Sequence, residues 1–314
     1  MKIAFNLDTI NYRGTTIAVS DYALYNQTVL GNESVIVYNN SIQYEKDMGS
    51  EKEAIEDLKT KFEVIGCAKH ELNSVLKKEQ VDLAYFIKYG HNDKELPDLK
   101  TAVHAVFQAK EPHGDRYAYI SEWLAEKMGG DIPFVPHIVD LPKATDNYRE
   151  KFNISEEQIV VCRYGGYYSF DLDFVKQSII ELLDETNKYV FMFVNTEPFY
   201  KHKNIIYIDS VVDRQKKSNF INTCDTMLHA RTRGESFGLS VCEFLYHNKP
   251  VLAWNNGLDQ NHMLLLKDTG MLYSEFDFKQ KLANIKNVEY DWKGIVKKFE
   301  PKPVIEKFKE VFID

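Results

Sequence analysis

The chain has 314 residues, of which 44% are hydrophobic and 13% aromatic, a composition typical of globular proteins. At roughly 100–200 residues per domain, this length predicts two domains, each large enough to bury its own core. The formal net charge is −8. Nucleic acid is therefore not expected as a partner, because phosphate binding needs a concentrated basic surface.

The first residues of the chain and its cysteines indicate where in the cell the protein is expected. The opening residues MKIAFNLD hold one lysine and no long apolar core, so they predict a strand and not a signal peptide. No apolar run approaches the roughly 18 residues that a membrane-spanning helix needs. Cys67, Cys162, Cys224 and Cys242 lie beside apolar residues without C-x-x-C spacing, which predicts buried, reduced thiols and no structural zinc. We expect a cytoplasmic protein, at most peripheral to a membrane.

The first part of the chain alternates between strand-like and helical stretches, which predicts a parallel sheet with helices on both faces. The apolar, β-rich runs are residues 2–7, 34–39, 62–66, 83–88, 101–107, 117–121 and 132–136. Helical spacing appears over residues 15–31, 51–61 and 71–80. The first of these stretches ends on Gly31, a residue type that favours the position after a helix.

A second alternating series begins near residue 158. Strands are predicted over residues 158–165, 189–195, 204–210, 226–230 and 250–254, and helices over residues 174–185 and 214–224. The domain boundary is predicted within residues 137–158, which hold a proline, several charges and a helix-capping signal at Ser155. These patterns predict two doubly wound α/β domains with a ligand site in the cleft between them.

The segment ARTRGESFGLSVCEFLYHNKPVLAW, residues 230–254, contains the strongest functional signal. A loop with Gly234 and Gly238 runs directly into an apolar helix. The free N–H groups of a helix start bind anions, and glycine lets a ligand approach the backbone closely. Glu243 lies about two turns into this helix, where a carboxylate can accept hydrogen bonds from the diol of a ribose. Glu235 at the loop tip would face what lies beyond the phosphates.

Two simpler interpretations fit the same residues. Thr232 and Glu235 match the T-x-x-E capping box of a helix start. Glu243 and His247 match an i,i+4 pair on a solvated helix face. Spacing alone does not decide between these interpretations and a sugar-nucleotide site.

The same segment resembles the signature of retaining GT-B glycosyltransferases of the family 4 type. In that signature two glutamates are separated by seven residues, FGL follows the first glutamate and a KPV strand follows the helix. This chain has Glu235, FGL at residues 237–239, Glu243 and KPV at residues 249–251, in that order. The resemblance implies that Glu235 contacts the donor sugar, that Glu243 holds the ribose, and that Phe237, Gly238 and Leu239 contact the phosphates.

Three further segments are similar to parts of that family. Residues 134–142 resemble the end of the first domain, with His137 in place of the usual asparagine. Residues 160–175 resemble the strand that opens the second domain and places Arg163 at the diphosphate, but the usual lysine after this arginine is missing. Residues 6–24 resemble the first strand and glycine loop, which places Gly14 near the leaving diphosphate. Together these matches imply that the chain is a compact, divergent member of that family.

The resemblance divides the chain into three parts. Residues 1–140 form an acceptor-binding Rossmann-like domain, residues 141–298 a nucleotide-sugar-binding one, and residues 299–314 a C-terminal helix that crosses back to the first domain. Polar residues between two strand-like runs are the acceptor-side candidates: His104, Glu111, His113, Asp115 and Arg116. His113 is our candidate for the histidine that touches the donor sugar, because loops carry function. His104 alternates with apolar residues and is expected to be structural.

The implied activity is transfer of a sugar, with retention, from a UDP- or GDP-linked donor to a glycan, lipid or protein hydroxyl. Arg163 and the amides at 237–239 would stabilise the leaving diphosphate without a metal, and no other cofactor is expected. The histidines and acids lack metal-ligand spacing. Two alternatives remain open. A GT-B shell that binds without turnover fits the missing lysine, and a sugar-nucleotide epimerase would need acid–base groups that the sequence does not locate.

Overall fold

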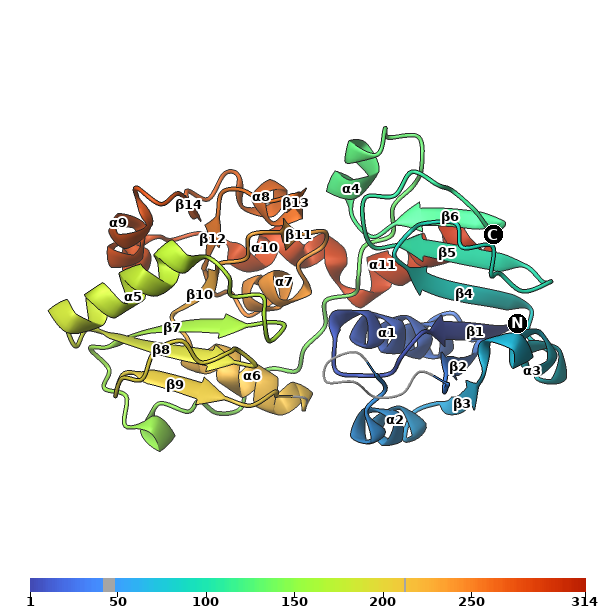
Figure 1. Ribbon diagram of the computed structural model, residues 1–314, viewed down its shortest axis with the longest axis horizontal. Coiled ribbons are helices and arrows are strands. Elements are labelled where there is room, and N and C mark those ends of the chain that lie inside the picture. Colours follow the sequence, from blue (N-terminus) through green and yellow to red (C-terminus); the bar gives the residue numbers. More distant parts are fainter. Residues whose placement is uncertain (42–48, 212) are drawn as a thin grey trace. The chain divides into compact units, whose positions relative to one another are not determined.

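The structure is a computed structural model that describes residues 1–41, 49–211 and 213–314. The chain divides into two compact units. Unit 1 is Met1–Ile138 with Phe299–Asp314, and unit 2 is Val139–Lys298. Each unit is built on a six-stranded parallel sheet, and the elements of each can be followed by label in Figure 1.

The elements of unit 1 alternate between strands and helices. Its strands are β1 (Lys2–Leu7), β2 (Glu33–Asn39), β3 (Glu63–Cys67), β4 (Leu83–Lys88), β5 (Thr101–Ala105) and β6 (Arg116–Tyr119). Its helices are α1 (Gly14–Thr28), α2 (Lys52–Lys59), α3 (Leu72–Lys78), α4 (Glu122–Lys127) and α11 (Pro301–Phe308), followed by a π-helical turn, η5 (Lys309–Ile313). Strands β1, β4 and β5 are almost wholly buried, as expected of apolar runs in a sheet covered on both faces.

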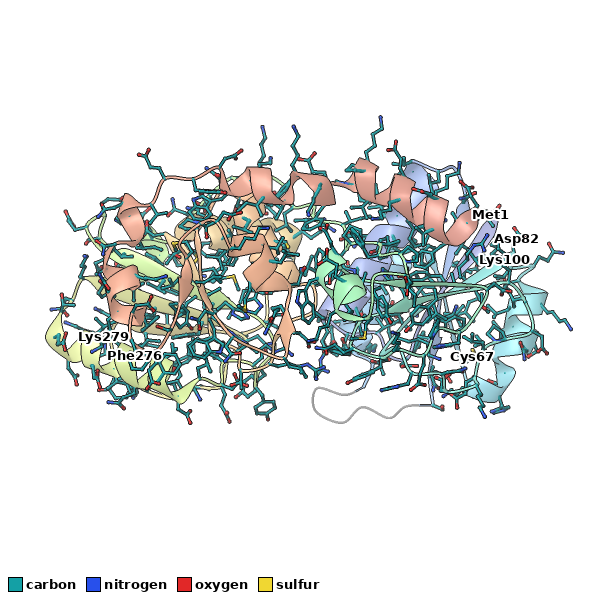
Figure 2. All side chains as sticks on the ribbon, turned by 90° about the horizontal axis from the view of Figure 1, so that it is seen from above. Met1, Cys67, Asp82, Lys100, Phe276 and Lys279 are labelled. Atoms are coloured by element: carbon teal, nitrogen blue, oxygen red, sulfur yellow. A yellow bond between two sulfur atoms is a disulfide. The ribbon has the colours of Figure 1, made fainter. Side chains whose placement is uncertain are left out.

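The strands of unit 1 lie in the order β3-β2-β1-β4-β5-β6. Strands β2 and β3 are added on one side of β1, and β4, β5 and β6 on the other. The point between β1 and β4 is therefore the topological switch point of a doubly wound sheet. Figure 2 labels Met1, Asp82 and Lys100, which lie together at the amino edge of this sheet. Ligands of such folds bind at the opposite, carboxyl edge.

The core of unit 1 includes the end of the chain. Phe308 stacks on Phe5 and Tyr22, and Phe312 contacts Tyr85 and His104. Both phenylalanines are fully buried, and burying one such side chain contributes about 1.5–3 kcal/mol. The last helix is thereby fixed to the first sheet by packing.

Unit 2 has the same alternation. Its strands are β7 (Ile159–Tyr164), β8 (Tyr189–Val194), β9 (Ile205–Ile208), β10 (Thr226–His229), β11 (Gly234–Glu235), β12 (Val251–Trp254), β13 (Asp259–Gln260) and β14 (Leu272–Tyr273). Its helices are α5 (Asp173–Glu185), α6 (Arg214–Thr223), α7 (Leu239–Tyr246), α8 (Asn261–Leu266), α9 (Phe278–Ala283) and α10 (Trp292–Val296).

The main sheet of unit 2 has the order β14-β12-β10-β7-β8-β9, and β11 pairs with β13 in a separate two-stranded ladder. The switch point lies between β7 and β10. Right-handed crossovers that run in the same direction put their helices on the same face of a sheet, and α6 and α7 are neighbours there. Phe220 of α6 packs edge-on against Phe244 of α7, with ring centroids 6.4 Å apart.

One predicted strand is absent. Residues 132–136 form only an isolated bridge, between Phe134 and Tyr119. Pro133 and Pro136 flank this point, and proline has no N–H for a ladder. The prediction of a full strand there is wrong.

The cysteines correct a second prediction. Cys162 of β7 and Cys224, which follows α6, form a disulfide with a Cα–Cα distance of 5.8 Å, within the usual range for a bridge. Cys67 and Cys242 are free and buried. The expectation of four reduced thiols is therefore wrong for one pair, and the cysteines no longer support a cytoplasmic location. Across the residues that the structure describes, no helix is both long and apolar enough to cross a bilayer.

Candidate functional site

The loop before α7 has the backbone geometry of a tight turn against a neighbouring strand. Gly234 has φ +75°, and a Cβ there would overlap the carbonyl of Asp259. Gly238 caps α7 in the left-handed region, with φ +86° and no side-chain cap. Both positions favour glycine, so the two glycines are explained by the turn itself. The turn leaves the first amides of α7 without a capping side chain.

The capping-box interpretation of this loop is wrong. The helix begins at Leu239 and not near Thr232, and the Thr232 amide donates to Asp171 instead. The Glu235 carboxylate contacts His229 and Arg231. Glu235 is therefore available for chemistry at this loop and is not used in a helix cap.

Glu235 is held as a partly buried carboxylate, with a side chain 20% exposed, among basic groups. Its Oε2 accepts from Nη1 of Arg231 at 3.1 Å, and its Oε1 lies 3.5 Å from Nε2 of His229. Burial by itself raises the pKa of Glu235, but the contact with His229 and the charge of Arg231 outweigh it and lower the pKa to about 2. This carboxylate is thus ionised at every physiological pH.

His229 and His262 are site residues that the sequence analysis missed. Their rings lie 4.5 Å apart. Nε2 of His262 donates to the carbonyl of Trp254, and burial followed by the charge of His229 lowers the pKa of His262 to about 3. Nδ1 of His229 has no hydrogen-bond partner among the described residues. In the sequence, His229 is the penultimate residue of the strand predicted over residues 226–230, just before the loop.

Glu243 is also buried, with a side chain 5% exposed. Its Oε1 accepts from Nζ of Lys217 at 2.5 Å, and its Oε2 has no partner within the described residues. The interpretation of Glu243 and His247 as a solvated surface pair is therefore wrong. Lys217 was not a candidate in the sequence, because one lysine in the charged run RQKK looks like any other.

Arg163 lies at the end of β7 and is 3% exposed. Its guanidinium is occupied by internal acceptors, which are the oxygens of Val194, Asn195, Thr196, Gly166 and Ser169, at 2.6–3.3 Å. Burial lowers the pKa of Arg163 to about 10, and the negative charge of Glu235 opposes this shift. The arginine therefore joins two loops at the carboxyl edge. Its role at a diphosphate remains a prediction.

The predicted residues of unit 1 are spread over several places. Gly14 is the first residue of α1, and a Cβ there would meet open space. His104 is fully buried. Its Nε2 donates to the carbonyl of Val135 at 2.8 Å, and its Nδ1 accepts from the hydroxyl of Tyr85 at 2.6 Å. Burial lowers the pKa of His104 to about 4, so it is a neutral core histidine, as the sequence predicted.

The polar residues of the loop after β5 do not gather in one place. Glu111 accepts from the amide of Asn92, in the segment that follows β4. Asp115 accepts from the amide of Thr101 at 2.7 Å, and Arg116 begins β6, which places both at the amino edge. His113 lies against the tilted ring of Tyr117, with ring centroids 5.5 Å apart, and its Nδ1 donates to the carbonyl of Glu111. Contact of His113 with a donor sugar remains a prediction.

Unit 1 has a pocket of its own at its carboxyl edge. Its empty volume is about 560 Å³ when the open mouth is included. Asn6 lines it and leaves Oδ1 without a partner among the described residues. Two ion pairs also line it, Lys88 with Asp93 and Lys69 with Glu95. The charges of these two pairs balance, and apolar side chains such as Leu7 and Phe86 line much of the rest of the pocket. In the described part of the chain, no three His, Cys, Asp or Glu side chains gather as metal ligands.

No protein-family model matches this chain, and no curated protein sequence does. Solved structures do. The crystal structure of Anabaena Alr3699/HepE in complex with UDP and glucose aligns over 99% of this chain and 98% of its own, with 12% identity and a TM-score of 0.74. A glycosyltransferase from Rickettsia africae ESF-5 aligns over 99% and 97%, with 12% identity and a TM-score of 0.72.

A third structure gives the same result. WaaG, a glycosyltransferase involved in lipopolysaccharide biosynthesis, aligns over 99% of both chains, with 12% identity and a TM-score of 0.67. At this identity the likeness establishes the fold alone. The chain has the GT-B fold, with two doubly wound units of six parallel strands each, and the predicted fold class is confirmed.

Proposed function

We propose that this protein is a retaining glycosyltransferase that moves a sugar from a nucleoside-diphosphate sugar to a hydroxyl acceptor without a metal. The observation that carries the proposal is the arrangement at the carboxyl edge of unit 2. There an uncapped helix start at Leu239, an ionised Glu235 and a buried Glu243 lie within one loop and two helical turns. These are the groups that a phosphate, a sugar and a ribose require.

The chemistry follows from where charge develops. When the bond between the sugar and the phosphate breaks, negative charge collects on the leaving diphosphate and positive charge on the sugar. The amides of Phe237, Gly238 and Leu239 supply hydrogen bonds to the diphosphate, and Arg231 is a nearby cation. Glu235 stays ionised and faces the developing positive charge. No protein nucleophile is assigned; the leaving phosphate accepts the proton of the acceptor hydroxyl.

The structural neighbours are consistent with this donor. Anabaena Alr3699/HepE was crystallised with UDP-glucose as well as with UDP and glucose. Transfer of that donor class to this chain rests on the shared fold and on the loop described above. We propose a UDP- or GDP-linked donor, because ribose and phosphate contacts are common to both.

The acceptor belongs to unit 1 in this proposal. The pocket lined by Asn6, Lys88 and Asp93 presents donors and acceptors of hydrogen bonds with little net charge. Such a surface suits the hydroxyl groups of a glycan, and the acceptor classes considered are glycan, lipid and protein.

One observation favours a second candidate, a GT-B protein that binds sugar nucleotides without turnover. The guanidinium of Arg163 is engaged by five internal oxygens, and the lysine expected after it is missing. A site with fewer free cations stabilises a leaving diphosphate less.

Titration calorimetry of the full chain with UDP, GDP, ADP, CMP and dTDP, each with and without EDTA, tests the proposal. We expect one nucleoside diphosphate to bind with a micromolar or lower Kd, and with the same Kd in EDTA. Binding that disappears in EDTA would contradict the metal-free mechanism. Folded protein that binds no nucleotide would overturn the donor site. The anomeric configuration of the product, read by proton NMR, separates retention from inversion, and binding without transfer would favour the second candidate.

A further inference from the structure

Lys217 and Glu243 form an ion pair in the interior of unit 2. Nζ of Lys217 lies 2.5 Å from Oε1 of Glu243, and the two side chains are 6% and 5% exposed. Taking two charges out of water costs several kcal/mol per ion, and attraction inside the protein repays this only with good geometry. Two apolar side chains of similar volume would stabilise the fold as well or better. Stability alone therefore does not explain why this ion pair is buried here.

Lys217 is fixed from a second side by Tyr164. Its Nζ lies over the ring of Tyr164, 4.3 Å from the centroid, and the hydroxyl of Tyr164 donates to the carbonyl of Val211 at 2.6 Å. Burial by itself lowers the pKa of Lys217, but the negative charge of Glu243 outweighs it and raises the pKa. The lysine is thus a permanent cation held between one carboxylate and one aromatic face.

The pair lies at the ligand edge of the sheet. Tyr164 is the last residue of β7, Lys217 is in the first turns of α6 after β9, and Glu243 is the fifth residue of α7 after the glycine turn. The carboxyl ends of the strands beside the switch point converge here.

The contact leaves half of the carboxylate unused. Lysine is a point donor and engages Oε1 alone, while Oε2 of Glu243 is buried and has no partner among the described residues. An unsatisfied buried carboxylate oxygen is costly. A hydroxyl donor from a ligand would satisfy it.

We propose that Lys217 is a positioning residue for the nucleotide, which holds Glu243 so that Oε2 accepts a hydrogen bond from a ribose hydroxyl. This inference rests on the proposed function, because it needs a nucleotide at the carboxyl edge of unit 2. It assigns Lys217 no contact with the reacting atoms.

The test is the preference for ribose over deoxyribose, because that preference reports the hydroxyl contact and not the stability of the fold. Calorimetry of the full chain compares UDP with 2′-deoxy-UDP, with GDP and 2′-deoxy-GDP in parallel. We expect the wild type to bind the ribonucleotide about tenfold or more tightly, the strength of a hydrogen bond to a charged group. In Lys217→Met this preference should fall to less than about twofold. The matched control is Lys216→Met, one residue away and exposed, which should keep the wild-type preference.

Lys217→Arg keeps the inference testable if Lys217→Met does not fold. Arginine preserves the cation, but its fork binds both oxygens of a carboxylate, so Oε2 would be occupied and the preference should again fall to less than about twofold. A wild-type preference retained in either folded variant would overturn the positioning role. A wild type that binds ribo- and deoxynucleotides equally would overturn it too. A wild type that binds no nucleotide would instead overturn the proposed function.

Discussion

The two units have the same strand order but differ in how many charged side chains they bury. Among the residues that the structure describes, unit 1 buries one aspartate, Asp21, and a neutral histidine, His104, deep among aromatic rings. Unit 2 buries more charged side chains, among them Arg163 and the pair of Lys217 with Glu243, and Glu235 is partly buried near them. Buried charges are costly, so a fold that needed only stability would not keep them there. Because the topology is the same in both units, this difference in buried charge supports our proposal of a donor site in unit 2.

The largest expected effect is on turnover, at Glu235. In Glu235→Gln we expect transfer to slow by about 100-fold or more, because a preorganised charge at the reacting sugar is removed while the shape is kept. Initial rates with the donor identified by calorimetry measure this. A folded variant with the wild-type rate would remove Glu235 from the mechanism.

The pH dependence of Glu235 has a defined sign. Its pKa is lowered from 4.5 to about 2 in the folded state, so its stabilising contribution is complete above pH 4.5 and is lost as the pH falls toward 2. Urea unfolding at pH 5 and pH 3 should show a smaller loss of stability in Glu235→Gln than in the wild type. An equal loss in both would contradict the lowered pKa.

Arg163 should affect stability as well as ligand binding. The resemblance implies that Arg163 lies at the diphosphate, and the structure shows five internal oxygens around its guanidinium. We expect Arg163→Met to lower the free energy of unfolding by about 2–4 kcal/mol, because these acceptors lose their donors. Denaturant titration measures this, with the exposed Arg116→Met as control. A variant as stable as the wild type would contradict this structural role of the guanidinium.

His104 should govern acid sensitivity in unit 1. Its pKa falls from 6.5 to about 4 on folding, so the unfolded chain takes up a proton that the folded chain does not, and stability is lost as the pH falls from 6.5 to 4. Over 2.5 pH units this amounts to about 3 kcal/mol. In His104→Gln we expect a shallower loss between pH 7 and pH 5, and turnover at pH 7 within about threefold of the wild type. A large loss of turnover in the folded variant would contradict the division between the units.

The smallest effect is expected on the surface. The exposed pair Asp57–Lys61 in unit 1 and the partly exposed pair Asp173–Lys176 in unit 2 should each contribute less than about 0.5 kcal/mol. Lys61→Ala and Lys176→Ala, measured by thermal unfolding, should behave alike. A clear difference between them would show that the units differ in more than their buried groups.

Most of the architecture was predictable, because hydrophobic periodicity reports the covered faces of strands and helices directly. The strand predicted over residues 2–7 matches β1 (Lys2–Leu7), and the helix over residues 174–185 lies within one residue of α5 (Asp173–Glu185). The strand predicted over residues 132–136 does not form, because its prolines lack the N–H groups that a strand ladder needs.

The site was predictable where it is local in sequence. The turn and the two glutamates fall within ten residues, so one segment was enough to find them. The partners were not predictable, because Lys217 lies 26 residues from Glu243 and the disulfide joins cysteines 62 residues apart. Such contacts depend on which helices share a face of the sheet. A single sequence does not report this at the level of one lysine.

Hydrogen–deuterium exchange of the full chain, with and without a saturating nucleoside diphosphate, tests the central claim most directly. We predict slower exchange at residues 234–246, which form the glycine turn and α7, and in the first turn of α6, with smaller changes in the sheet of unit 1. Protection confined to unit 1, with residues 234–246 unchanged while the nucleotide is bound, would contradict the claim that the donor site is built on unit 2.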